Sequence, residues 1–226
     1  MRFGGLETKI VGGSDAGPIV VLLHGFGAPG DDLVSLARVL RAPPGTRFVF
    51  PAAPIDLGRA YAGGRAWWKI DLEARLLRHA RGEPIDLTEV PAGLVEARAM
   101  VEEFLSEMER ALSPTRLVLG GFSQGAMLSL DVALHSTRAL AGLVLMSGTH
   151  LAANEWAARL PARRGVPVFM SHGRDDELLP FAISEGLRDT LKEAGLVVDW
   201  VSFRGGHGIP PGVLDGVGAF LERVLA

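Results

Sequence analysis

Leu117-Val118-Leu119-Gly120-Gly121-Phe122-Ser123-Gln124-Gly125 joins a short apolar run to a second apolar segment at residues 126–134. The first three residues are typical of a buried strand, and the longer segment after Gly125 is typical of a helix. A Gly-x-Ser-x-Gly pattern between a strand and a helix predicts a sharp turn that lifts the serine hydroxyl above the sheet. The helix N-terminus below Ser123 would favour negative charge developing at the reacting atom. A chance glycine-rich turn is the alternative, and the flanking strand and helix patterns disfavour it.

Outward from this turn, short runs rich in Val and Leu recur, and each stops at Gly, Pro or Ser. They occupy residues 19–23, 47–50, 143–146 and 166–170, with a more polar run at 197–203 and an antiparallel edge strand at 9–11. Helical patterns lie at 31–40, 91–112, 123–135, 183–194 and 213–225. Continuous apolar strands alternating with helices predict a doubly wound α/β domain with a mostly parallel sheet. We expect one domain over residues 1–226, with the loops after the strands gathered at one sheet edge.

One stretch, residues 56–91, has no clear buried strand. It holds the pair Trp67-Trp68 and a charged segment from Asp71 to Asp86. A long excursion in a compact domain is usually functional. We interpret it as a cap or substrate-side loop. The alternative is a solvated insertion with Trp67 or Trp68 packed in the core.

The composition excludes several classes of function. The chain has 226 residues, a formal net charge of −3 and no block of Lys and Arg, which argues against a nucleic-acid partner. It has no cysteine, so disulfides, thiolate nucleophiles and cysteine-ligated zinc are excluded. No apolar run approaches the roughly 20 residues that cross a bilayer, and the start does not resemble a secretion signal. We therefore expect a cytoplasmic protein without stable membrane insertion; a homodimer is compatible with the sequence, but no residue pattern argues for one.

A serine hydroxyl needs a base beside it to act as a nucleophile near neutral pH. Of six histidines, His207 is the best candidate because it lies among glycines between the last strand and the last helix. Such a loop cannot build a core and lies on the functional edge of the sheet. His79 is interpreted as solvated, while His24 and His172, which each precede a glycine, are interpreted as turn residues.

The acid that orients the base should follow the run 166–170, where Asp175, Asp176 and Glu177 stand in a row. Each could reach the histidine, so the residues alone leave the choice open. The order Ser, acid, His along the chain is the order of the α/β-hydrolase fold.

A tetrahedral intermediate also needs two N–H donors. We expect them from Gln124, which follows the nucleophile, and from Phe26 in the turn His24-Gly25-Phe26-Gly27 after an early strand. That glycine-rich turn lacks the Lys-Ser/Thr pair of a phosphate-binding loop, so nucleotides are discounted. No cofactor and no metal are expected.

Nearly the whole chain resembles the phospholipase/carboxylesterase family, which includes bacterial carboxylesterases and acyl-protein thioesterases. Five motifs carry the resemblance: Leu23-His24-Gly25-Phe26-Gly27, Gly63-Gly64-Arg65-Ala66-Trp67-Trp68, Gly120 to Ala126, His172-Gly173 leading to Leu179-Pro180, and Gly206-His207. The resemblance implies an esterase with a Ser-Asp-His triad and no cofactor.

The resemblance also implies that Asp176, four residues before Pro180, is the acid, with Asp175 in reserve. It places the oxyanion donors at the backbones of Phe26 and Gln124, and it aligns the Trp68 segment with the border of the acyl pocket. Two departures, the longer charged segment and Gly-His-Gly-Ile-Pro around His207, favour a general carboxylesterase over a thioesterase.

The predicted function is hydrolysis of small acyl esters by Ser123, His207 and Asp176 through an acyl-enzyme. The apolar residues near the predicted site loops are the candidate walls of the acyl pocket: Trp68, Leu178, Leu179, Phe181 and Ile209. An acyl-thioesterase or lysophospholipase is the alternative, and a non-catalytic binding protein that kept the fold is a third hypothesis.

Overall fold

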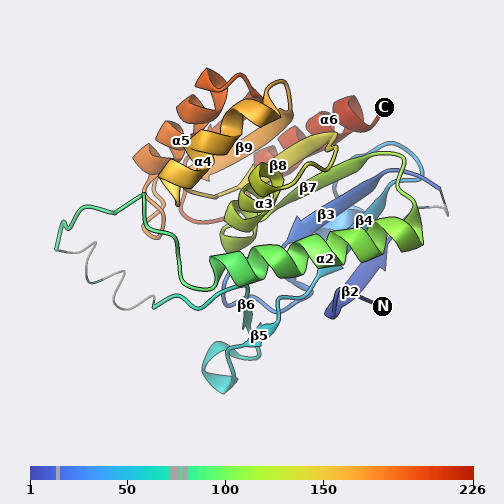
Figure 1. Ribbon diagram of the computed structural model, residues 1–226, viewed down its shortest axis with the longest axis horizontal. Helices are drawn as coiled ribbons and strands as arrows, with labels where there is room; N and C mark the ends of the chain where they lie inside the picture. The colour runs from blue at the N-terminus through green and yellow to red at the C-terminus, as the bar shows by residue number, and fades with distance from the viewer. Residues whose placement is uncertain (14–15, 72–76, 78–80) are drawn as a thin grey trace.

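The computed structural model describes residues 1–13, 16–71, 77 and 81–226. Its centre is an eight-stranded sheet in the order β1-β2-β4-β3-β7-β8-β9-β10 (Figure 1). β2 pairs antiparallel with both the edge strand β1 and β4, and the six strands β4-β3-β7-β8-β9-β10 run parallel to one another. The strands span Arg2–Phe3 (β1), Leu6–Val11 (β2), Ile19–Leu23 (β3), Arg47–Pro51 (β4), Leu117–Phe122 (β7), Gly142–Met146 (β8), Pro167–Gly173 (β9) and Val197–Phe203 (β10).

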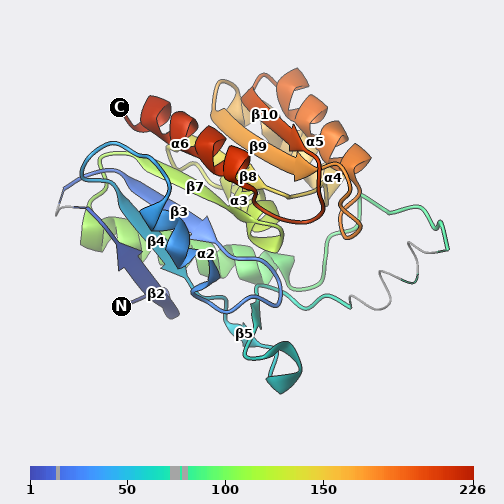
Figure 2. The same ribbon diagram turned by 180° about the vertical axis from the view of Figure 1, so that it is seen from behind.

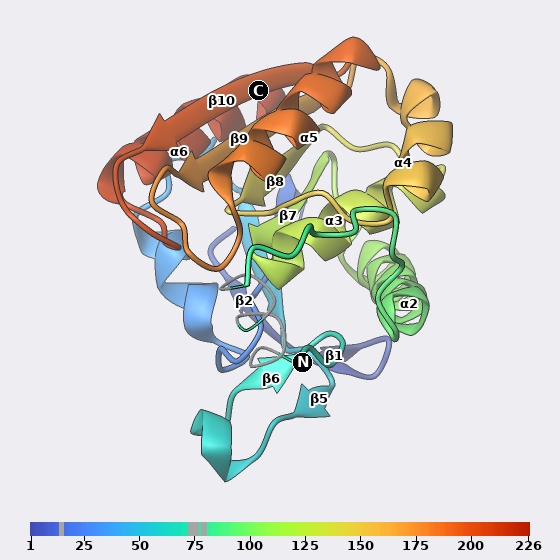
Figure 3. The same ribbon diagram turned by 90° about the vertical axis from the view of Figure 1, so that its left-hand side faces the viewer.

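Helices cover both faces of this sheet, as the alternating sequence pattern predicts. Figures 1 and 3 show α2 (Leu94–Leu112), α3 (Gln124–His135) and α5 (Phe181–Glu193) on one face. Figure 2 shows α6 (Pro211–Leu225) and the 3-10 helix η1 (Asp32–Arg38) on the other. The expected doubly wound α/β architecture is therefore confirmed.

Two apolar cores result, one on each side of the sheet. Successive strand residues alternate between them: Val21 and Leu23 pack in the larger core with α2, α3 and α5, whereas Val20 and Leu22 pack in the smaller core with α6. This alternation follows from the period of two in a strand. Because both faces are covered, the central strands read as continuous apolar runs rather than as alternating ones.

The helix α3 is buried on nearly every side, with each residue from 124 to 134 buried. It lies between α2 and the short helix α4 (Ala153–Arg159) while also packing on the sheet. A helix that is apolar all round belongs in the middle of a layer. The turn that contains Ser123, at the N-terminus of this helix, is consequently supported by packing from several sides.

Some expected elements differ in type or extent. The helix expected at 31–40 is the 3-10 helix η1, which buries only Leu33 and so gains little from full α-helical packing. The helix expected from residue 91 begins at Leu94, because Gly93 takes a positive φ of 90°. The helix α4 and the following 3-10 helix η3 (Leu160–Arg163) were not expected, since they are short and bury few side chains.

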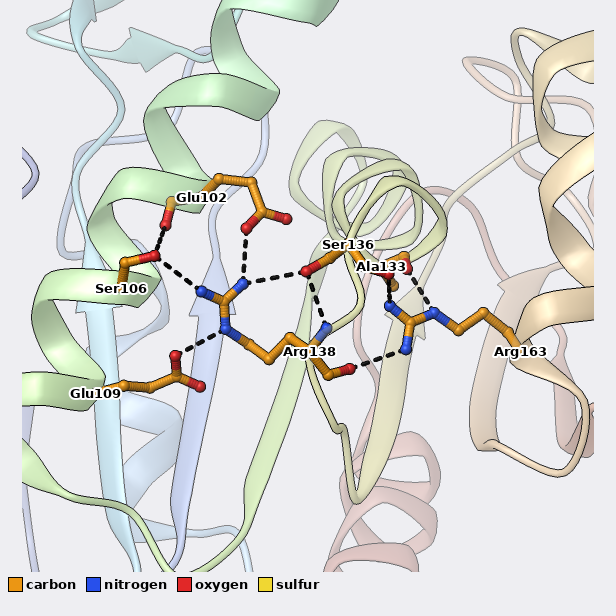
Figure 4. Close-up of polar contacts among 7 residues, drawn as sticks. All are labelled: Glu102, Ser106, Glu109, Ala133, Ser136, Arg138 and Arg163. Carbon is orange, nitrogen blue, oxygen red and sulfur yellow. Dashed lines mark hydrogen bonds and ion pairs between the residues drawn. The ribbon is translucent and has the colours of Figure 1, made fainter.

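Two arginines tie the helices of this layer together (Figure 4). Arg138 donates to Glu102 at 2.7 Å and to Glu109 at 2.8 Å, both on α2. Arg163 of η3 donates to the main-chain oxygens of Ala133 at 2.6 Å and Arg138 at 2.8 Å, and also to that of Ser136. The guanidinium of Arg163 thus binds carbonyl oxygens at the C-terminus of α3, where the helix dipole favours a positive charge.

The excursion after β4 begins as a small hairpin. Strands β5 (Ile55–Asp56) and β6 (Arg65–Ala66) pair antiparallel around the 3-10 helix η2 (Arg59–Tyr61), and the hairpin projects from the sheet edge (Figure 3). Trp67 and Trp68 follow it, and both are buried in the larger core. His79 and the other residues of the charged segment at 72–76, 78 and 80 lie outside the described residues.

The end of the excursion returns to the body of the molecule. The main-chain N–H groups of Ala152 and Ala153 donate to the carbonyls of Glu89 and Leu87 at 3.2 and 2.8 Å, which brings residues 87–89 beside the start of α4 (Figure 1). Within the described part of the chain, no helix combines the length and apolar character that crossing a membrane requires.

Candidate active site

Ser123 occupies the turn between β7 and α3 with φ 54° and ψ −117°, a conformation that non-glycine residues rarely adopt. Its N–H donates to the carbonyl of Met146 at 2.9 Å, which fixes the turn to the neighbouring strand β8. The two flanking glycines have no room for a side chain: a Cβ on Gly121 would lie 2.3 Å from the oxygen of Leu23, and one on Gly125 only 2.0 Å from it. The close approach of α3 to β3 therefore requires glycine at both positions.

His207 and Asp176 meet at the same end of the sheet. His207 belongs to the loop between β10 and α6, and its Nδ1 lies 2.7 Å from Asp176 Oδ2. The second carboxylate oxygen, Oδ1, accepts from the N–H groups of Leu178 at 3.0 Å and Leu179 at 2.9 Å. Since a carboxylate only accepts, Nδ1 carries the proton and Nε2 is the bare nitrogen of the neutral ring. That tautomer is the one a general base needs.

Asp176 stays ionised despite its burial. Burial alone would raise its pKa, but hydrogen bonds from His172, His207 and the Leu179 N–H outweigh that cost and hold the pKa well below its usual value. A carboxylate that remains charged near neutral pH can stabilise a protonated His207.

The neighbouring acid has a different contact. Asp175 Oδ2 accepts from the N–H of Gly205 at 3.0 Å, and the Asp175 N–H donates to the Gly205 carbonyl at 3.0 Å. Asp175 thus holds the start of the histidine loop, whereas Asp176 contacts the histidine itself.

The ring of His207 lies against the residue that precedes Ser123. Its centroid is 4.8 Å from that of Phe122. Among the described residues, His207 Nε2 has no hydrogen-bond partner, and Ser123 Oγ is not bonded to it. Catalytic hydrogen bonds are often long in ligand-free sites and shorten in the substrate complex.

The turn containing Phe26 is fixed by the hairpin of the excursion. Gly27 N–H donates to the carbonyl of Arg65 at 2.9 Å, and Arg65 N–H donates to that of Ala28 at 2.9 Å. His24 braces the same turn from the other side: Nδ1 bonds the Gly25 carbonyl at 2.8 Å, and Nε2 accepts from Ala53 N–H at 3.0 Å. Burial lowers the pKa of His24, so the ring stays neutral in this role.

The N–H groups of Phe26 and Gln124 have no main-chain acceptor among the described residues. Both belong to turns that follow adjacent parallel strands, β3 and β7. Unpaired donors at one edge of a sheet are available to bind a negatively charged oxygen.

The Gln124 side chain has a role that the sequence analysis missed. It is fully buried, its Oε1 accepts from Trp67 N–H at 2.9 Å, and its Nε2 donates to the Trp68 carbonyl at 2.8 Å. Trp67 Nε1 in turn donates to the His24 carbonyl at 2.9 Å. The turn that contains Ser123, the tryptophan pair and the turn that contains Phe26 are thereby held together by hydrogen bonds.

The five candidate pocket residues differ in their packing. Trp68 and Leu179 are buried in the larger core, while Ile209 packs against the smaller core on the other face of the sheet. Phe181 lies against Trp200, with ring centroids 5.9 Å apart, and Leu178 is exposed. Of the two interpretations of the excursion, the burial of Trp68 matches the one that packs a tryptophan in the core.

His172 was interpreted as a turn residue, but the structure places it inside β9. It is fully buried, and its Nε2 lies 2.8 Å from the Leu179 carbonyl and 3.2 Å from Asp176 Oδ2. The spacing of four residues between His172 and Asp176 is the only sequence signal that could have indicated this contact.

The chain is similar to known hydrolases over almost its full length. A family model described as Phospholipase/Carboxylesterase matches residues 8–225. Acyl-protein thioesterase 1 of Gibberella zeae is 30% identical over 91% of this chain and 90% of its own, and carboxylesterase SOBER1 of Arabidopsis thaliana is 24% identical over 91% and 90%. Among solved structures, esterase PE8 has a TM-score of 0.80 at 30% identity, covering 98% of this chain and 99% of its own.

Proposed function

Because the chain belongs to the phospholipase/carboxylesterase family of α/β-hydrolases and is a hydrolase of the esterase and thioesterase type, we propose that it cleaves carboxylic esters of small acyl substrates through an acyl-enzyme on Ser123. The observation that carries the proposal is the 2.7 Å contact between His207 Nδ1 and Asp176 Oδ2 at the sheet edge where Ser123 holds its strained turn. A positioned base, an acid that orients it and an exposed nucleophile are the parts that acyl transfer needs.

In the first half of the reaction, His207 Nε2 takes the proton of Ser123 Oγ as that oxygen attacks the ester carbonyl. The N–H groups of Phe26 and Gln124 bind the oxyanion, a contribution for which losing one donor costs about 10²–10³ in rate. The bond to the leaving oxygen then breaks as His207 protonates the alcohol. The carboxylate of Asp176 stabilises the transient imidazolium.

In the second half, water attacks the acyl-enzyme while His207 takes one of its protons. The tetrahedral intermediate collapses, the carboxylic acid leaves, and the proton returns to Ser123 Oγ. No cofactor is consumed in either half.

The test combines probe labelling with hydrolysis. A fluorophosphonate probe should label wild-type protein on the peptide that contains Ser123, and p-nitrophenyl acetate and butyrate should be hydrolysed. The Ser123→Ala variant should lose labelling and more than about 10³-fold in kcat/KM. The matched control is Ser129→Ala on α3, whose buried hydroxyl donates to the Gly125 carbonyl at 2.8 Å. Full activity in Ser123→Ala would contradict the proposal, and a folded wild-type protein that never reacts with the probe would favour a binding protein.

A thioester is the second candidate substrate, because acyl-protein thioesterase 1 is among the relatives at 30% identity. The same serine, base and oxyanion donors serve both chemistries, so the site geometry does not separate them. Matched p-nitrophenyl esters and acyl thioesters of two to sixteen carbons, assayed on the same preparation, give the ratio of kcat/KM that decides between them.

We also propose that residues 56–91 form a substrate-side segment of a single domain. Tyr61 of the hairpin packs edge-on against Phe26, with ring centroids 5.6 Å apart and planes at 90°, so the hairpin borders the proposed oxyanion turn. Limited proteolysis with and without a bound acyl phosphonate should show protection of this segment in the complex. The candidate pocket walls, a homodimer and a cytoplasmic location stay predictions from the sequence.

A further inference from the structure

The carboxylate of Asp176 has two histidines on one oxygen. Oδ2 lies 2.7 Å from His207 Nδ1 and 3.2 Å from His172 Nε2. The mechanism above uses only the first of these contacts. His172 comes from β9, one residue before the strand ends, so its position is set by the sheet rather than by the loop.

The tautomer of His172 follows from its partners. Nε2 also lies 2.8 Å from the Leu179 carbonyl, which can only accept a hydrogen bond, so Nε2 carries the proton and donates it to that carbonyl, with Asp176 Oδ2 3.2 Å from the same nitrogen. Among the described residues, Nδ1 is buried without a hydrogen-bond partner. A proton there would be an unpaired buried donor, which is costly, so the ring is a neutral donor.

The charged groups around this pair are few. Asp176 faces His172 and His207; the nearby Arg174 lies over the Phe181 ring at 5.9 Å, and Asp175 is bonded to Gly205. In the contacts of the described residues, no Lys or Arg side chain reaches the Asp176 carboxylate.

We propose, resting on the function proposed above, that His172 is a positioning residue: its Nε2–H holds Asp176 Oδ2 toward His207 and withdraws charge from that oxygen. With three hydrogen bonds and the Nε2–H of His172 close to Oδ2, the carboxylate has one orientation and a reduced basicity. Without His172, the carboxylate is freer to rotate and more basic, so it both positions His207 less well and raises the pH at which His207 gives up its proton.

The first test measures the tautomer of His172 in the wild-type protein. Nitrogen-15 NMR of histidine-labelled enzyme should show His172 as the neutral Nε2–H tautomer, assigned by the loss of its signals in His172→Gln. A proton on Nδ1 would overturn the proposal, because the contact with Asp176 would then have no hydrogen.

The second test compares two variants. His172→Gln can place an amide N–H near the position of Nε2, whereas His172→Leu fills the space without a donor. The leucine variant should lose about tenfold or more in kcat with little change in KM, a loss typical of removing a partner that orients a functional group. The acid limb of its kcat/KM profile should shift to higher pH, and the glutamine variant should recover most of both effects.

The outcomes separate the two proposals. If Ser123→Ala is inactive but both His172 variants keep the wild-type rate and pH profile, the positioning role is wrong while the proposed function stands. If the leucine variant is less stable but keeps the wild-type pH profile, the positioning role is wrong. His172 then contributes only to stability, through its hydrogen bond to Leu179. If His172→Leu does not fold, His172→Asn, whose shorter amide does not reach Oδ2, takes its place in the comparison with His172→Gln.

Discussion

Gln124 Oε1 accepts a hydrogen bond from the main-chain N–H of Trp67 at 2.9 Å, across 57 residues of sequence. The same side chain donates to the Trp68 carbonyl at 2.8 Å. The residue after the proposed nucleophile therefore serves twice: its main chain is a proposed oxyanion donor, and its side chain bonds main-chain groups of both tryptophans.

Replacing Gln124 by Met should cost both stability and activity. The buried N–H of Trp67 and carbonyl of Trp68 would lose their partners, at about 1–3 kcal/mol for each group left unsatisfied. The urea dependence of unfolding gives the stability change, and hydrolysis of p-nitrophenyl acetate gives the rate. The control Ser129→Ala should change the rate little, and a Gln124→Met variant as stable as wild type would contradict the anchoring role.

The two adjacent aspartates should differ sharply. Asp176→Asn should lower kcat by about 10⁴-fold, because an amide facing Nδ1 favours the wrong tautomer of His207. Asp175→Asn, whose carboxylate accepts from the Gly205 N–H and not from His207, should stay within a few-fold of wild type. Steady-state kinetics on the two variants decide it, and equal losses would refute the assignment of Asp176.

Gly125, which follows Ser123 and Gln124 at the start of α3, should not tolerate a methyl group. In Gly125→Ala, the Cβ would meet the Leu23 oxygen at 2.0 Å, so the free energy of unfolding should fall by more than about 2 kcal/mol. Gly186→Ala on α5 is the matched control, because nothing lies within 4 Å of its Cβ, and it should gain about 0.5–1 kcal/mol. Chemical denaturation measures both, and an unaffected Gly125→Ala protein would show that the turn is looser than described.

Removing Arg138 should lower the free energy of unfolding and leave kcat of the folded protein unchanged. Its side chain is largely buried and pairs with Glu102 and Glu109, so Arg138→Ala leaves two carboxylates uncompensated and should cost about 3 kcal/mol (Figure 4). Arg2→Ala breaks an exposed pair with Glu7 and should cost less than about 1 kcal/mol. Thermal unfolding compares them, and a fall in kcat for the folded Arg138→Ala protein would be evidence against a purely structural role.

By itself, the sequence determined that helices cover both faces of a mostly parallel sheet and in which order the strands and helices follow one another. These features are local patterns: the apolar run 117–119, the glycines around Ser123 and the other continuous apolar runs. Strands that are apolar on both faces must be covered by helices on both sides, which leaves few alternatives to a doubly wound sheet. His207 could be singled out for the same reason, because a glycine-rich loop at a strand end cannot be core.

What only the tertiary structure decided are the contacts between segments far apart in the chain. Three consecutive acidic residues are equivalent candidates in the sequence, yet the loop after β9 turns Asp176 toward His207 and Asp175 toward Gly205. The Gln124 anchor and the contact of His172 with Asp176 likewise depend on which buried groups the packing brings within hydrogen-bond distance. A buried polar group must find a partner, but the chain alone does not say which one, because that choice is made by the geometry of the sheet and not by neighbours in sequence.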